Sequence, residues 1–252
     1  MSRTLLALLC LLAGPLEAEE IVLGLSRDQV AITATFEGDD VLIFGAVRRE
    51  APIPEGAPLN VIVTVKGPDE PITVRRKERR LGIWVNTDAV EVDSAPSFYA
   101  VAATGPLREV LKDTEDLRYR ITIPRAIRSV GAPMNVTDPA AFTRALIRIR
   151  AGDRLYQTLE GAVDLEAQTL FRTEIGLPAN LTEGDYIVRI FLTREGRIVD
   201  VFETVIPVEK VGLERWLYNL AHEKPLIYGL MSLAIAIFAG WGASEVFRIA
   251  RR

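Results

Sequence analysis

The run DYIVRIFLT (Asp185–Thr193) is followed by REG (Arg194–Gly196) and then by RIVDVFETVIPV (Arg197–Val208). In the first run every second residue from Tyr186 to Leu192 is apolar, which is the period of a strand with one buried face. The short segment that contains glycine between the runs is typical of the turn in an antiparallel hairpin. This ending predicts a mainly β chain and suits an immunoglobulin-like β-sandwich.

Short runs rich in β-branched and aromatic residues recur upstream of this hairpin, from Ile21 onward. In Val61–Lys66 the valines fall on one face, so this strand is expected to bury one side. The run Val41–Val47 is apolar throughout, which is expected of a central strand covered on both faces, and the turn residues 38–40 precede it. The chain from Ile21 to Val208 is therefore predicted to consist mostly of strands.

Two segments have the periodicity of helices instead. Pro106–Lys112 places proline at an expected first helical position. A second helix is expected to begin at Pro139 with Asp138 as its cap and to end at Gly152. The apolar stripe of that second helix consists of Phe142, Ala145, Leu146 and Ile149.

The preferred layout is one immunoglobulin-like β-sandwich over residues 19–208, interrupted by a helix-containing insertion at about 80–160. Two tandem β-domains are the alternative, with a boundary in the polar segment Asp113–Asp116. The preference arises because the second half alone has too few strand candidates for a separate sandwich.

The end of the chain predicts one membrane-spanning helix at residues 225–247. Residues 226–244 carry no charge. At 1.5 Å per residue such a run covers roughly 28 Å, close to the hydrocarbon thickness of a bilayer. Arg248, Arg251 and Arg252 follow the span, and they favour a cytoplasmic tail at residues 248–252.

Small residues repeat every four positions in this span, at Ser232, Ala236, Gly240 and Ser244. Such a face permits close packing against a helix of a polytopic membrane protein or of a second copy, and contact with lipid alone is the alternative. Residues 209–224, just before the span, are predicted to form an amphipathic juxtamembrane helix. Its apolar residues are Leu213, Trp216, Leu217 and Leu220. This helix would lie on the headgroups or pack against the body.

The N-terminus predicts a signal peptide at residues 1–18, because Arg3 precedes a short apolar run and Ala18 suits a cleavage site. An uncleaved anchor is the alternative. Cleavage would remove Cys10 and leave a cysteine-free chain. With the C-terminal span, this predicts a single-pass protein of the bacterial inner membrane with a periplasmic body.

Charge and composition exclude several function classes. Residues 19–224 contain 26 basic and 32 acidic side chains, a balance that argues against nucleic-acid binding. The single histidine, His222, lies beside the span, so a histidine-based triad or a zinc or copper site is not expected. We therefore predict no catalytic residue, no metal site and no cofactor.

A basic cluster stands out against this acidic background, namely Arg75, Arg76, Lys77, Arg79 and Arg80. It leads into Trp84, which we expect to be a core residue rather than a ligand platform. The cluster, with Trp84, is a candidate binding patch for an anion or an acidic partner. A charged edge strand that prevents aggregation is the alternative.

The segments Arg75–Asn86, Phe98–Ala102, Glu223–Leu230 and Phe238–Trp241 resemble the putative transmembrane protein family of alphaproteobacteria. The resemblance extends over nearly the whole mature chain. It implies an inner-membrane protein with a periplasmic body, and it brings no activity or catalytic residue, because the family has no known function.

Together these features predict a non-enzymatic accessory or interaction subunit of a membrane transporter or envelope complex, with membrane lipid around its span. A periplasmic ligand-binding or sensor module for a small anion is the alternative.

Overall fold

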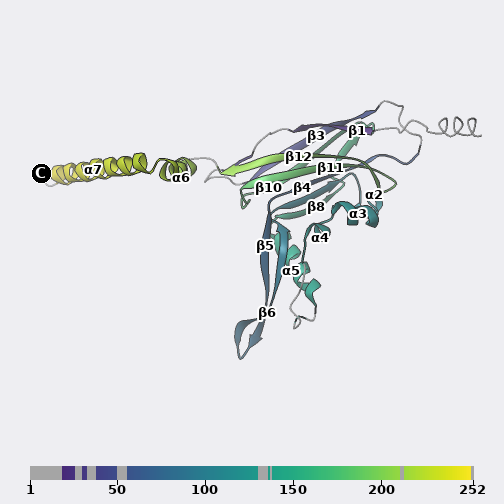
Figure 1. Ribbon diagram of the computed structural model, residues 1–252, viewed down its shortest axis with the longest axis horizontal. Coiled ribbons are helices and arrows are strands. Elements are labelled where there is room, and N and C mark those ends of the chain that lie inside the picture. The colour runs from purple at the N-terminus through teal and green to yellow at the C-terminus, as the bar shows by residue number, and fades with distance from the viewer. Residues whose placement is uncertain are drawn as a thin grey trace, which may run out of the picture. The chain divides into compact units, whose positions relative to one another are not determined.

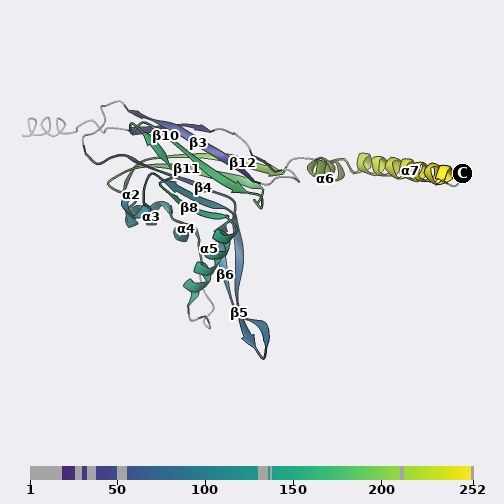
Figure 2. The same ribbon diagram turned by 180° about the vertical axis from the view of Figure 1, so that it is seen from behind.

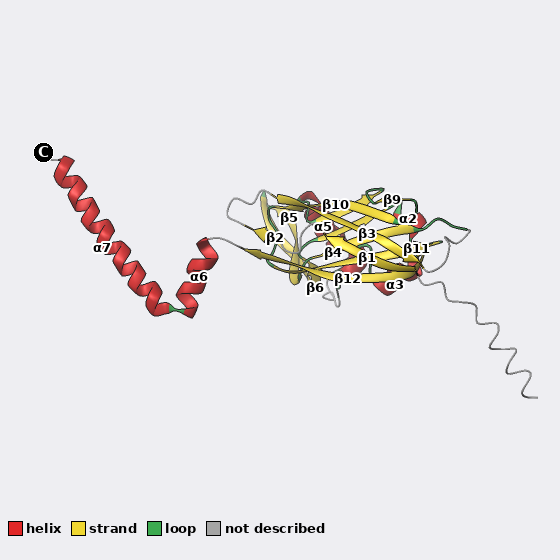
Figure 3. Ribbon diagram, turned by 90° about the horizontal axis from the view of Figure 1, so that it is seen from above, coloured by secondary structure: helices red, strands yellow, loops and turns green. Residues whose placement is uncertain are grey.

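The computed structural model describes residues 19–25, 30–32, 38–49, 56–129, 136, 138–210 and 213–250. The predicted signal peptide lies outside these residues. The chain is mainly β, as expected (Figure 3). Its strands are β1 (Glu19–Leu25), β2 (Val30–Ile32), β3 (Gly38–Arg49), β4 (Asn60–Lys66), β5 (Asp69–Arg80), β6 (Ile83–Pro96), β7 (Tyr99–Ala103), β8 (Tyr156–Glu160), β9 (Asp164–Glu166), β10 (Leu170–Pro178), β11 (Gly184–Arg194) and β12 (Arg197–Lys210).

The strands form two sheets and one separate ribbon (Figures 1 and 2). Sheet A has the order β1-β3-β10-β9, and sheet B has the order β2-β12-β11-β4-β7-β8. β5 and β6 pair with each other as a two-stranded ribbon. β7 and β8 pair in parallel, and the four helices between them supply the crossover that a parallel pair requires.

The core lies between the two sheets. Ile43 and Ile175 from sheet A are fully buried, as are Val188 and Ile190 from sheet B. Residues of both sheets, including Val65 in β4, line one small apolar gap. Burial of alternate side chains on facing strands is the main source of stability for such a body.

The burial that the sequence pattern predicted was wrong for two strands, β3 and β4. β3 is central in sheet A, as expected, but Leu42 and Phe44 are exposed, because sheet B covers only one face of sheet A. In β4 the residues from Val61 to Val65 are buried on both faces. The outer face of sheet B is covered because α3 packs on it, with the Tyr119 ring 5.8 Å from the Phe191 ring of β11.

The helices of the body are α2 (Leu107–Val110), α3 (Asp113–Tyr119), α4 (Ile123–Ala126) and α5 (Pro139–Gly152). In α5 the Asp138 carboxylate caps the helix by accepting from the Ala141 amide at 3.1 Å, as predicted. Phe142 and Leu146 are buried, but Ile149 is exposed, so its place in the core was wrong.

The other helices differ from the prediction. Pro106 is the N-cap of α2 rather than its first helical residue, and the helix ends at Val110. The polar segment Asp113–Asp116, the proposed boundary, instead begins α3. Its acidic residues suit the first turn of a helix because they interact favourably with the helix dipole.

The predicted final hairpin is confirmed, with β11 and β12 joined by Glu195 and Gly196 at φ of 50° and 73°. Residues 37–208 belong to one compact unit, and residues 209–252 belong to another. The second unit contains α6 (Leu213–Glu223) and α7 (Pro225–Ala250). In α7 the window 225–242 is long and apolar enough to span a membrane.

Candidate functional sites

The basic cluster lies in the β5–β6 ribbon. Arg79 pairs with Trp84 and Arg80 pairs with Ile83 across the ribbon, so the cluster and the tryptophan meet at its tip. Figures 1 and 2 show the β5–β6 ribbon extending away from the two sheets. Trp84 is 69% exposed and Ile83 is 64% exposed. The expectation that Trp84 belongs to the core was wrong, because a two-stranded ribbon has no second layer against which the ring can pack.

The base of the ribbon is fixed to α5. Val90 is fully buried and packs with Phe142 and Val74. The Arg76 guanidinium lies 5.0 Å from the centre of the Phe142 ring and 3.6 Å from the Asp88 carboxylate. Arg76 therefore contacts the supported base, although its side chain is exposed, as are those of Arg75, Lys77, Arg79 and Arg80.

The exposed bases of the ribbon do not converge on one point. Successive residues of a strand point to opposite faces, so Arg79 and Trp84 share one face while Arg80 and Ile83 share the other. Arg80 also lies 3.3 Å from the Glu78 carboxylate. The arrangement suits a broad protruding contact surface better than a closed pocket for a small ion.

The turn at the tip has an unfavourable residue. Leu81 is fully exposed and adopts a φ of 49°, next to Gly82 at 86°. Two-residue turns with positive φ prefer asparagine or glycine at the first position. A leucine there costs about 1 kcal/mol or more, and its side chain gains no burial within the chain. This conflict with local preference marks the tip as a candidate for function.

A second candidate is a groove of about 500 Å³ beside sheet B. Its charged side chains are Lys66, Arg118, Arg120, Arg128 and Arg189, together with Asp69 and Glu203. Lys66 and Asp69 form an ion pair with a 2.7 Å contact. Among the described residues, no carboxylate lies within ion-pair distance of the other four cationic side chains.

The wall of this groove is held by buried polar contacts. The Asp116 carboxylate accepts from the amides of Ile121 and Thr122 at 3.0 and 2.8 Å, and from the Thr122 hydroxyl at 2.7 Å. The Tyr99 hydroxyl donates to the Ile121 carbonyl at 2.9 Å. Burial raises the pKa of Tyr99, so its phenol keeps this proton.

Arg189 reaches the same wall from β11. Its guanidinium donates to the Tyr119 carbonyl at 2.9 Å and to the Tyr99 hydroxyl at 3.4 Å, and it lies 5.3 Å from the centre of the Phe191 ring. The half-buried charge is therefore oriented by uncharged acceptors. Sequence reasoning missed this groove because its cations come from separate elements and form no local motif.

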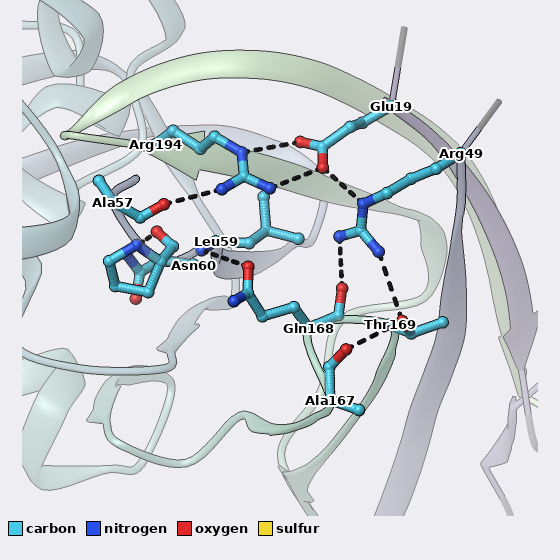
Figure 4. A network of polar contacts seen from close by, with 10 residues as sticks. Glu19, Arg49, Ala57, Leu59, Asn60, Ala167, Gln168, Thr169 and Arg194 are labelled. Carbon is cyan, nitrogen blue, oxygen red and sulfur yellow. Dashed lines mark hydrogen bonds and ion pairs between the residues drawn. The ribbon is translucent and has the colours of Figure 1, made fainter. Parts of the chain in front are cut away.

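A third cluster is the buried charge network around Glu19 (Figure 4). The Glu19 side chain is only 7% exposed, and it contacts Arg49 at 2.6 Å and Arg194 at 2.7 Å. Arg49 also donates to the Gln168 carbonyl, and Arg194 donates to the Ala57 carbonyl at 2.7 Å. Because Glu19, Arg49 and Arg194 are all hydrogen-bonded, the network links β1 to β3 and to β11.

Burial disfavours the charged form of Glu19, but hydrogen bonds from Arg194 and Arg49 outweigh it and lower the pKa of Glu19 below its ordinary value of 4.5. The carboxylate is therefore ionised at neutral pH. We assign this network to stability rather than to chemistry.

The predicted helix-packing residues all lie on α7. Ser232, Ala236 and Gly240 follow one another at four-residue spacing and therefore share a face. The side chain of Ser244 lies outside the described part of the structure. The Ser232 hydroxyl donates to the Tyr228 carbonyl at 2.9 Å, so its polar group is satisfied within the helix.

Metal-ligating side chains do not cluster in the part of the chain that the structure describes, where no group of three or more His, Cys, Asp and Glu residues could hold an ion. His222 lies in α6, where its ring stacks on Tyr218 with 4.0 Å between the ring centres.

A comparison with protein families matches residues 20–249 to the putative transmembrane protein family. The chain belongs to this family. The matched residues include the β5–β6 ribbon, the lining of the groove beside sheet B and the apolar window of α7. No curated protein matches the chain.

Proposed function

We propose that this chain is a single-pass inner-membrane protein that acts through protein contact, as a non-enzymatic accessory subunit of a transporter or envelope complex. In this proposal residues 1–18 are a cleaved signal peptide, the immunoglobulin-like body is periplasmic and the tail is cytoplasmic. The apolar window of α7 and the basic residues after it support that topology.

The tip of the β5–β6 ribbon carries the proposal. Leu81, Ile83 and Trp84 are exposed together, and the turn keeps leucine at positive φ where asparagine or glycine would be more stable. Tryptophan and arginine are the residues that most often dominate binding at protein interfaces. An apolar tip that carries such residues is suited to insertion into a recess of another protein.

The charge of the ribbon indicates what that partner presents. Arg75, Lys77, Arg79 and Arg80 are exposed beside the apolar tip, on a body with a net negative charge. Complementary charge steers association and discourages wrong partners. We therefore propose a protein partner with an apolar recess bordered by acidic side chains.

The span offers a second contact with the same complex. The face of Ser232, Ala236 and Gly240 permits a neighbouring helix, from a polytopic subunit or from a second copy, to approach closely. Contact at both the ribbon and the span would increase the overall affinity, because the second contact forms within the complex.

Site-specific photo-crosslinking tests this proposal in intact membranes. A photoreactive residue replaces Trp84 in the full-length protein, and Val199, exposed on β12, takes the same replacement as the control. We expect one discrete protein adduct from position 84 and none from position 199. Trp84→Glu in a protein that carries the crosslinker at Ile83 should abolish the adduct.

Two results would overturn the protein-contact proposal. Labelling of lipid alone from position 84 would mean that the tip contacts the membrane surface. Equal labelling from positions 84 and 199 would mean that the tip has no preferred partner.

A further inference from the structure

We infer that the basic groove beside sheet B is a binding site for a small solute with two or more carboxylate or phosphate groups. This site shares no residue with the ribbon tip, and the inference does not rest on the proposed function.

The groove carries a net positive charge. Lys66 and Asp69 neutralise each other at 2.7 Å. The remaining charged lining is Arg118, Arg120, Arg128 and Arg189 against Glu203 alone. A net positive recess is unusual on a body that is acidic as a whole, because charge usually disperses over a protein surface.

Arg189 is held in the groove by uncharged partners. Its side chain is half-buried, and its donors meet the Tyr119 carbonyl and the Tyr99 hydroxyl rather than a carboxylate. Glu203 is the cross-strand neighbour of Arg189 but lies outside ion-pair distance among the described residues. An anion that enters the groove would therefore gain from pairing with a half-buried guanidinium that has no direct ion pair. The contacts with Tyr119 and Tyr99 fix the orientation of the guanidinium before a ligand arrives.

The wall of the groove at the end of α3 is rigid. Arg120 ends α3 with a φ of 53°, and the following residues are fastened by Asp116 through three hydrogen bonds. Arg118 lies with its guanidinium 5.3 Å from the centre of the Tyr119 ring. The backbone that carries Arg118 and Arg120 is therefore fixed, although the two side chains are exposed, and only Arg189 has its guanidinium held in place before a ligand binds.

The volume and the donors together define the ligand class. About 500 Å³ is in the range of sites for small organic molecules. Arginine recognises carboxylate and phosphate with paired hydrogen bonds, and several arginines favour a ligand with more than one acidic group. An ion with one acidic group, such as a single phosphate, would leave part of the groove without contact.

The test uses the full-length protein in detergent, with citrate and inorganic pyrophosphate as probes and glucose as the uncharged control. At constant ionic strength we expect at least one anion to raise the midpoint of thermal unfolding and to give saturable heat in calorimetry. The double variant Arg118→Glu, Arg128→Glu should weaken that binding by at least tenfold.

The matched control is Arg148→Glu, which changes an exposed arginine on α5 outside the groove and should bind as the wild type does. Circular dichroism without ligand checks that each variant is folded. If the double variant does not fold, the milder Arg128→Gln variant takes its place. The inference is overturned if neither anion binds the wild type at 10 mM, or if Arg148→Glu loses binding as much as the groove variants do.

Discussion

At the scale of single residues, Glu19 shows how this body holds a charge that has little exposed surface. Its side chain is 7% exposed, and its carboxylate accepts hydrogen bonds from two nitrogens of Arg194, at 3.1 and 2.7 Å, and from one nitrogen of Arg49. Charge-assisted bonds of this kind are about twice as strong as neutral ones. The network therefore stabilises the pairing of β1 with the body, where an unpaired Glu19 would destabilise it.

Arg194→Met should lower the free energy of unfolding by about 2–3 kcal/mol at pH 7, because Glu19 loses two of its charged hydrogen bonds in a buried site. Arg172→Met is the control, since its ion pair with Asp164 is exposed, and it should cost less than about 0.5 kcal/mol. Chemical denaturation of the full-length protein, followed by circular dichroism, measures both. Equal losses in the two variants would contradict the role given to Glu19.

The same network predicts a pH dependence. The pKa of Glu19 is lower in the folded protein than its ordinary value of 4.5. Its stabilisation is therefore fully present above about pH 5 and is lost as the pH falls through the folded pKa. The stability difference between the wild type and Arg194→Met should shrink correspondingly in acid, and a difference that stays constant down to pH 3 would contradict this assignment.

At the scale of elements, a substitution in the turn between β5 and β6 distinguishes an effect on stability from an effect on binding. Leu81→Asn should leave the protein as stable or raise the free energy of unfolding by about 1 kcal/mol, because asparagine tolerates positive φ. The same change should weaken capture of the partner at the tip. Thermal unfolding measures the first effect and crosslinking from Ile83 the second. A destabilised Leu81→Asn variant would mean that the leucine contributes to the fold.

The turn between α3 and α4 depends on one carboxylate. Asp116→Ala should lower the free energy of unfolding by about 2–4 kcal/mol, because it leaves the amides of Ile121 and Thr122 without their acceptor in a buried place. Asp116→Asn keeps one acceptor oxygen and should lose less. Chemical denaturation of both variants measures these two losses in the free energy of unfolding. Binding of anions in the groove should weaken in the same order.

The elements that the sequence predicted correctly are those whose signals are local. The β11–β12 hairpin and the Asp138 cap depend on residues that are neighbours in the chain. The exposure of Phe44 and the double burial of β4 depend instead on which layer covers each sheet, and periodicity does not report that.

The candidate sites also differ in how far local sequence signals predict them. The basic cluster was visible as a run, but the exposure of Trp84 follows from the ribbon standing apart from both sheets. The groove was not predictable, because Lys66, Arg118 and Arg189 meet only through strand pairing and the packing of α3 on sheet B.

At the scale of the whole molecule, the orientation proposed from the apolar window of α7 and the three arginines after it can be tested with fusions. Basic residues cross the inner membrane reluctantly, so the tail should stay in the cytoplasm. Alkaline phosphatase should be active when it is fused after Lys224 and inactive after Arg252, whereas green fluorescent protein should show the opposite pattern. Replacing Arg248, Arg251 and Arg252 by glutamate should increase phosphatase activity at the C-terminal fusion, because only those charges oppose translocation of the tail. Active phosphatase at the unmodified C-terminus would place the tail in the periplasm. That result would reverse the proposed topology while leaving the fold of the body and the chemistry of its groove unchanged.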